Sequence, residues 1–196
     1  MTKLLTPMLI LLAACTSASA AECTNISKID FANRTLSLAR AQQAAVPGGR
    51  AFGGPAVGQV FHFHQGVAVE YEGGDGKEPD WQTTIRQDVV AKPEASRTIR
   101  FLTLFRNHLT GSGSWTYLVG FACSGGRIQE VFQSSGMFMR VVKVSAELVE
   151  ITMPVWRSAA PACCPSARKE FRYIWDRRAH RYILTRSDQM NRTSGE

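Results

Sequence analysis

Short apolar runs and turn clusters alternate along most of this chain. From residue 58 onward, runs rich in Val, Ile, Phe, Thr, Tyr and Trp recur about every ten residues, with Gly- and Ser-rich clusters between them. This spacing is typical of antiparallel sheet proteins, in which each run forms one strand. The pattern predicts strands at 58–64, 67–72, 81–89, 98–106, 115–123, 127–133, 138–144, 148–156, 169–175 and 181–185.

The sequences between these runs predict turns. The plainest are GGDG at 73–76, LTGSGS at 109–114 and SGG at 124–126, because glycine adopts a positive φ at low cost. The stretch 26–45 has no clean period of 3.6 and reads as an irregular entry with one short helix, followed by a Gly- and Pro-rich loop. The expected fold is α+β and predominantly β, a single domain of mainly antiparallel strands with short N-terminal helical content.

Composition supports one globular domain. The chain has 196 residues, of which 44% are hydrophobic and 20% charged, and its five cysteines are too few for a disulfide scaffold without a core. Its unbroken apolar run, at residues 8–14, is too short to span a bilayer, which takes about 20 residues. We therefore expect no internal membrane-spanning helix.

The first residues have the pattern of an export signal. Lys3 precedes an apolar segment at 4–12, and Ala-Ser-Ala at 18–20 is a small-residue cleavage site. A second interpretation overlaps the first, because Leu-Ala-Ala-Cys at 12–15 matches a bacterial lipobox in which Cys15 is acylated. Both remain open. They predict a signal peptide at 1–20 (or 1–14), a domain at 21–186, a flexible tail at 187–196, and a periplasmic or outer-membrane-anchored protein.

Four cysteines remain after either cleavage, and export allows them to oxidise. They are Cys23, Cys123, Cys163 and Cys164. Adjacent Cys163 and Cys164 can close a strained disulfide or each join another partner, and four cysteines allow three connectivities. The pair could clamp the turn before the last hairpin, or act as a redox-sensitive switch.

The sequence offers weak signals for metal binding and catalysis. In Phe-His-Phe-His at 61–64, a strand places His62 and His64 on one face and the phenylalanines on the other. Two histidines alone do not make a zinc site, so a solvated strand face is the competing interpretation. Acidic residues at 75–80 fit neither an EF-hand nor a recognisable paired-carboxylate site, and no serine has an evident base. We expect no cofactor, and the sequence favours a non-enzymatic role.

Positive charge is concentrated near the C-terminus. Residues 157–186 hold eight Lys and Arg residues against two acidic ones, in a chain of formal net charge +7. The same stretch predicts a hairpin that turns at 177–179 and carries aromatic side chains on one face and cations on the other. It could bind an anionic lipid headgroup, lipopolysaccharide or a wall polymer. Alternatively, its arginines could form a solvated face that protects a sheet edge. The anion-binding residues proposed from this pattern are Arg168, Lys169, Arg172, Arg177, Arg178 and Arg181.

The C-terminal segment also resembles a known family. Pro-Ala-Cys-Cys-Pro-Ser at 161–166, followed by Phe-Arg-Tyr-Ile-Trp-Asp at 171–176, is similar to the Cys-Cys-Pro-Ser and Tyr-x-Trp-Asp-Gly elements of exported bacterial proteins of the LppP/LprE lipoprotein type. Residues 29–36 and 108–113 resemble two further elements of related periplasmic proteins. The chain departs from the pattern where Arg177 replaces the glycine after Trp-Asp and where His108 and Ser112 replace acidic residues. The resemblance implies an exported, β-rich domain, with a lipid anchor as one alternative, and no particular activity.

These observations lead to one main expectation and one alternative. The main expectation is an exported envelope protein that acts as a structural or binding module, with its basic hairpin against an anionic envelope component or another envelope protein. We expect no nucleic acid partner, and membrane attachment only through a lipid anchor on Cys15. The alternative is a redox-responsive protein that uses Cys163 and Cys164.

Overall fold

The computed structural model describes residues 23–38, 59–71, 78–111, 113–155, 165 and 167–191, with side chains as far as residue 188. Several sequence predictions lie outside these residues. They are the signal peptide, the lipidation site Cys15, the loop at 46–55, the turn at 73–76, the adjacent Cys163 and Cys164, and the end of the tail.

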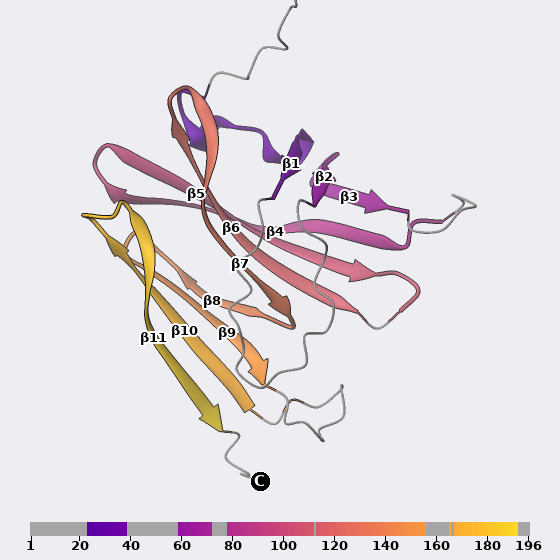
Figure 1. Cartoon of the computed structure of the whole chain (residues 1–196). Coiled ribbons are helices and arrows are strands. Elements are labelled where there is room, and N and C mark those ends of the chain that lie inside the picture. The colour runs from indigo at the N-terminus through magenta and orange to yellow at the C-terminus, as the bar shows by residue number, and fades with distance from the viewer. Residues whose placement is uncertain are drawn as a thin grey trace, which may run out of the picture.

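Two antiparallel meanders form the body of the protein (Figure 1). The first sheet has the order β3-β4-β5-β6-β7, and the second has the order β11-β10-β9-β8. The predicted antiparallel, β-rich architecture is therefore confirmed. The strands of the two sheets are β3 (Val67–Glu70), β4 (Trp81–Glu94), β5 (Arg97–His108), β6 (Ser114–Ser124), β7 (Arg127–Met137), β8 (Arg140–Val144), β9 (Leu148–Val155), β10 (Ala167–Asp176) and β11 (Arg181–Asn191).

The N-terminal segment forms a small separate layer. It contains two turns of 3-10 helix, η1 (Ile26–Lys28) and η2 (Phe31–Asn33), and then β1 (Thr35–Ser37), which pairs antiparallel with β2 (Val60–His62). The side chain of Asn25 accepts a hydrogen bond from the Ser27 N–H, and that of Asp30 accepts one from the Ala32 N–H. These two caps start the turns, because each satisfies a backbone donor that the short helix leaves free.

The five-stranded sheet is covered on both faces. Along β6, Tyr117, Val119 and Phe121 face the N-terminal layer, whereas Leu118 and Ala122 belong to the core shared with the four-stranded sheet. Successive side chains of a strand point to opposite faces, so a strand between two cores must be apolar at nearly every position. This explains why β6 lacks the polar alternation of a one-sided sheet.

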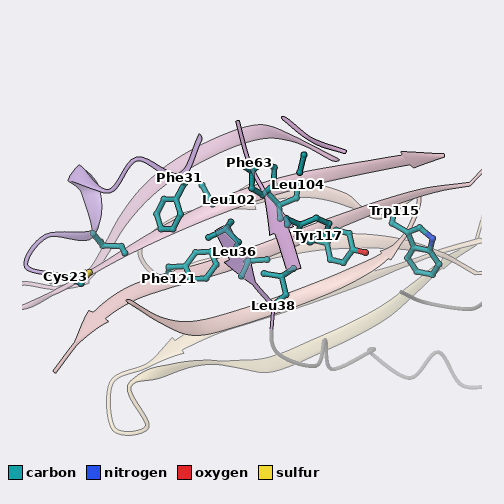
Figure 2. Close-up of a cluster of buried hydrophobic side chains, with 14 residues drawn as sticks. Cys23, Phe31, Leu36, Leu38, Phe63, Leu102, Leu104, Trp115, Tyr117 and Phe121 are labelled. Carbon is teal, nitrogen blue, oxygen red and sulfur yellow. The ribbon is translucent and has the colours of Figure 1, made fainter. Parts of the chain in front are cut away.

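The first core joins the N-terminal layer to the sheet. Figure 2 shows Cys23, Phe31 and Phe121 at one end of this cluster, Leu36 and Leu38 in its middle, and Trp115 at the other end. The rings of Phe31 and Phe121 stack with centroids 5.1 Å apart. A disulfide between Cys23 and Cys123, whose Cα atoms are 5.4 Å apart, ties the start of the layer to β6.

The second core holds the C-terminal hairpin by its aromatic face. The ring of Tyr182 meets those of Phe101, Phe132 and Trp175 edge-on at centroid distances of 5.6, 5.9 and 5.1 Å. Its hydroxyl donates to the carbonyl oxygens of Ser145 and Ala146, at 2.9 and 3.0 Å. The aromatic side chains of this hairpin therefore face the second core, as predicted.

Two predicted strand ends are corrected by the structure. β11 continues through Asn191, so the flexible tail predicted from residue 187 is wrong for residues 187–191, where Ser187 pairs with Phe171 and Asp188 with Glu170. β4 continues to Glu94, beyond the end predicted at residue 89. Both segments are sheet edges, since β3 pairs only with residues 81–84 of β4, and an edge strand tolerates polar residues and proline.

Candidate functional site

The six cations proposed from the sequence fall into two groups, and the first is engaged within the sheet. Arg172 lies between two carboxylates of the outer sheet face, with its Nη2 3.1 Å from Glu150 and its Nε bonded to Glu170. The ammonium of Lys169 lies 5.3 Å from the centre of the Phe171 ring. Arg168 donates a long hydrogen bond of 3.5 Å to the hydroxyl of Thr152. This group is charge-compensated or covered by neighbouring side chains.

The second group surrounds the turn of the β10–β11 hairpin. Arg177, Arg178 and Arg181 are exposed, and none of them forms an ion pair with another residue that the structure describes. We call these three side chains and the turn at residues 177–180 the cationic tip. The structure therefore brings together half of the predicted basic set at one end of the hairpin.

The cationic tip has a defined backbone. The carboxylate of Asp176 accepts hydrogen bonds from the N–H groups of Arg178 at 2.7 Å and Ala179 at 3.0 Å. These two bonds hold the pKa of Asp176 below its ordinary value, because they stabilise the charged carboxylate. An aspartate that closes a turn on its own backbone fixes where the following arginines project.

A second set of contacts fixes the tip to the first sheet. The indole N–H of Trp175 donates to Glu94 at 3.0 Å, and Nδ1 of His180 lies 3.2 Å from the same carboxylate oxygen. The guanidinium of Arg97 lies 5.5 Å from the centre of the Trp175 ring. The hydrogen bond from Trp175 is the main reason that the pKa of Glu94 lies below its ordinary value. In Figure 1 the β4–β5 and β10–β11 turns accordingly lie at the same end of the molecule.

A shallow depression of about 470 Å³ adjoins the tip, lined by residues 174–178, Ile183 and Thr185. Ile174 and Ile183 are direct partners across the hairpin, so both point to its outer face. The side chain of Ile174 is 46% exposed. The depression thus combines two adjacent apolar side chains with the arginines of the turn.

Comparisons with protein-family models, curated proteins and solved structures gave no match to this chain. The functional argument rests on the chemistry of its own residues.

A buried ion pair lies on the face of the five-stranded sheet that the N-terminal layer covers. Arg106 is 5% exposed, and its guanidinium contacts both carboxylate oxygens of Glu70, at 3.2 and 2.9 Å. Gln59 donates to Glu70 and accepts from the hydroxyl of Tyr117, and the Trp81 ring lies 4.0 Å from the guanidinium. Burial raises the pKa of Tyr117. These groups compensate one another, so the cluster attaches edge strand β3 to the sheet.

The sequence analysis did not identify this cluster, although the strand pattern contains a signal for it. Residues 102, 104 and 106 of β5 alternate toward one face, and Leu102 and Leu104 are both fully buried. An arginine that continues a buried face needs a buried partner, because an uncompensated charge there is costly.

The two histidines proposed as weak metal ligands both lie on an exposed strand face. Phe61 and Phe63 are buried while His62 and His64 are exposed, so the solvated strand face is confirmed. Nδ1 of His62 lies 2.9 Å from the hydroxyl of Thr35. Among the described residues, no three His, Cys, Asp or Glu side chains cluster as metal ligands would.

The structure shows the disulfide pairing of two of the four candidate cysteines. Cys23 pairs with Cys123, which is the pairing that leaves Cys163 and Cys164 to each other, but those two lie outside the described residues. The part of the chain that the structure covers also contains no helix with the length and apolar character needed to cross a bilayer.

Proposed function

We propose that this protein is a non-enzymatic binding module of the bacterial envelope that contacts an anionic surface through the cationic tip. The observation that carries the proposal is the difference between the two groups of cations. Arg172 is paired with carboxylates of its own sheet, whereas Arg177, Arg178 and Arg181 form no ion pair with a described residue, and Arg178 and Arg181 interact with Asp176 only through its charge. Arginines that form no ion pair within the protein keep their N–H donors available for external anions.

The geometry of the tip favours binding over simple solvation. Guanidinium groups form bidentate hydrogen bonds with phosphate and carboxylate groups, and three of them here lie at or directly beside one turn. The turn is held by Asp176 and by the contacts of Trp175 and His180 with Glu94. Binding should therefore cost little conformational entropy in the backbone of the turn. Such a contact should weaken as salt increases, because exposed charges are screened.

Other features are consistent with an envelope protein. The disulfide between Cys23 and Cys123 fits an oxidising compartment, and the N-terminal pattern fits export. Periplasmic or outer-membrane location, membership of the LppP/LprE-type family and short helical content near the N-terminus remain parts of this proposal. The redox alternative on Cys163 and Cys164 also stays open, and counting free thiols by mass spectrometry with and without mild reductant tests it.

Charge reversal at the tip tests the proposal. The variant Arg177→Glu with Arg178→Glu should lose about tenfold or more in affinity for anionic vesicles or polymers at low salt, since each arginine near such a surface contributes about 1 kcal/mol. A control with the same charge change, Arg140→Glu with Lys143→Glu on the exposed β8 edge, should lose much less. Equal losses in both variants would show that only net charge matters and would refute a specific role for the tip.

A further inference from the structure

We infer that the anionic surface is a phospholipid bilayer, and that Ile174 and Ile183 enter its apolar region while the arginines of the tip bind the phosphates. This inference rests on the proposed function and names the partner of the same site. The observation behind it is a juxtaposition: the depression at the tip is lined by two outward isoleucines as well as by Arg177 and Arg178.

The two isoleucines distinguish between kinds of anionic partner. A hydrated wall polymer or polyphosphate offers anions but no apolar region, so Ile174 would remain in water when such a polymer binds. A bilayer offers both, with phosphates directly above the acyl chains, and burial of apolar side chains there is favourable. An apolar pair beside arginines matches this layering, because Arg side chains can keep their charged ends at the headgroups.

Acidic groups near the tip reduce its positive charge without cancelling it, because Asp176, which acts on Arg178 and Arg181, and Glu94 stand against three arginines of the tip and Arg97. The carboxylate of Asp176 lines the depression but is held by the N–H groups of Arg178 and Ala179. Glu94 is held by Trp175 and His180. Farther along the outer face, Arg172 is compensated by Glu150 and Glu170, so net positive charge and exposed apolar surface coincide at the tip.

The amount of apolar surface is suited to reversible contact. Two isoleucines bury far less area than an amphipathic helix, so neither they nor the arginines alone would hold the protein on a bilayer. Both contributions are needed together. The contact would orient the molecule with the β4–β5 and β10–β11 turns toward the lipid.

The test compares vesicles with a soluble polyanion. The full chain is measured against vesicles of phosphatidylglycerol with phosphatidylcholine, against pure phosphatidylcholine vesicles, and against polyphosphate. The variant Ile174→Thr with Ile183→Thr keeps the β-branched shape that strands favour. It should lose about tenfold in affinity for the anionic vesicles and keep its affinity for polyphosphate. The control Val69→Thr with Val142→Thr changes two valines that are 46% and 57% exposed away from the tip, and should bind as the parent does.

The possible outcomes separate the two proposals. If charge reversal at Arg177 and Arg178 weakens vesicle binding but the isoleucine variant does not, the bilayer inference is overturned while the binding module stands. The same holds if polyphosphate binds more tightly than anionic vesicles. If charge reversal changes neither partner, the proposed function itself fails. Near-UV circular dichroism of each variant establishes that it is folded.

Discussion

Trp175 donates its indole N–H to the carboxylate of Glu94 across a separation of 81 residues along the chain. The bond joins the last hairpin to the β4–β5 turn, and His180 lies against the same carboxylate from the other side of the turn. One acidic residue of the first sheet therefore determines how the cationic tip of the second sheet is held.

Replacing Glu94 should make the stability of the protein less sensitive to acid. The pKa of Glu94 lies below its ordinary value of 4.5, chiefly because of the Trp175 bond. The carboxylate therefore contributes stability above the unfolded-state pKa, and this contribution is lost as the pH falls through the folded-state value. Thermal unfolding between neutral pH and pH 3 should show a smaller fall in Tm for Glu94→Gln than for the parent. A parallel fall in both proteins would contradict this role.

Breaking the buried ion pair should destabilise the first core. Glu70→Gln leaves the guanidinium of Arg106 without a compensating charge, so the free energy of unfolding should fall by about 3 kcal/mol. The double variant Arg106→Met with Glu70→Leu removes both charges and should recover most of that loss. Urea unfolding measures both values, and a loss below about 1 kcal/mol for Glu70→Gln would mean that water solvates the pair.

Removing the disulfide should destabilise the whole domain. Cys23 and Cys123 are separated by 100 residues, and closing a loop of this length constrains the unfolded chain by about 4 to 5 kcal/mol on the loop-entropy model. The variant Cys23→Ser with Cys123→Ser should unfold at a correspondingly lower denaturant concentration. Peptide mapping without reductant should recover the Cys23–Cys123 link in the parent, and a link from either residue to 163 or 164 would contradict the pairing.

Gly120 should not tolerate a side chain. A Cβ atom at this position of β6 would lie 2.9 Å from a ring carbon of Phe101 and 3.1 Å from the Cβ of Phe132, both in the second core. Gly120→Ala should therefore cost about 1 to 3 kcal/mol. Gly136→Ala is the matched control on β7, where the nearest atom is the sulfur of Met153 at 3.4 Å. Equal effects of the two substitutions would contradict the close approach at Gly120.

The local features of the fold could be predicted from the sequence. The predicted runs coincide with the cores of strands β2–β11. Strands and turns could be predicted because the spacing of apolar residues and the position of turn glycines determine the structure of only a few neighbouring residues. Gly125 and Gly126, in the predicted turn at 124–126, both have positive φ, and the hairpin turns where its arginines indicated. The alternation at 61–64 also correctly placed two rings inside and two imidazoles outside.

The remaining features depend on contacts between distant segments. β1 is three residues long and exists because it pairs with β2, which no local pattern encodes. Within the basic set, the sequence did not separate Arg172 from Arg177, since that difference depends on Glu150 in another strand. The same holds for Arg106, whose partner Glu70 lies 36 residues away.

The N-terminal layer has a further consequence for how the chain acquires its structure. A ribosome makes this layer first, but the surface that it covers belongs to β5 and β6, which are made much later. Phe31, Leu36 and Phe61 therefore stay exposed to solvent until β5 and β6 have formed. The layer therefore cannot dock before the chain has been made as far as β6, so the nascent protein passes through an aggregation-sensitive stage in which a holding chaperone would be useful.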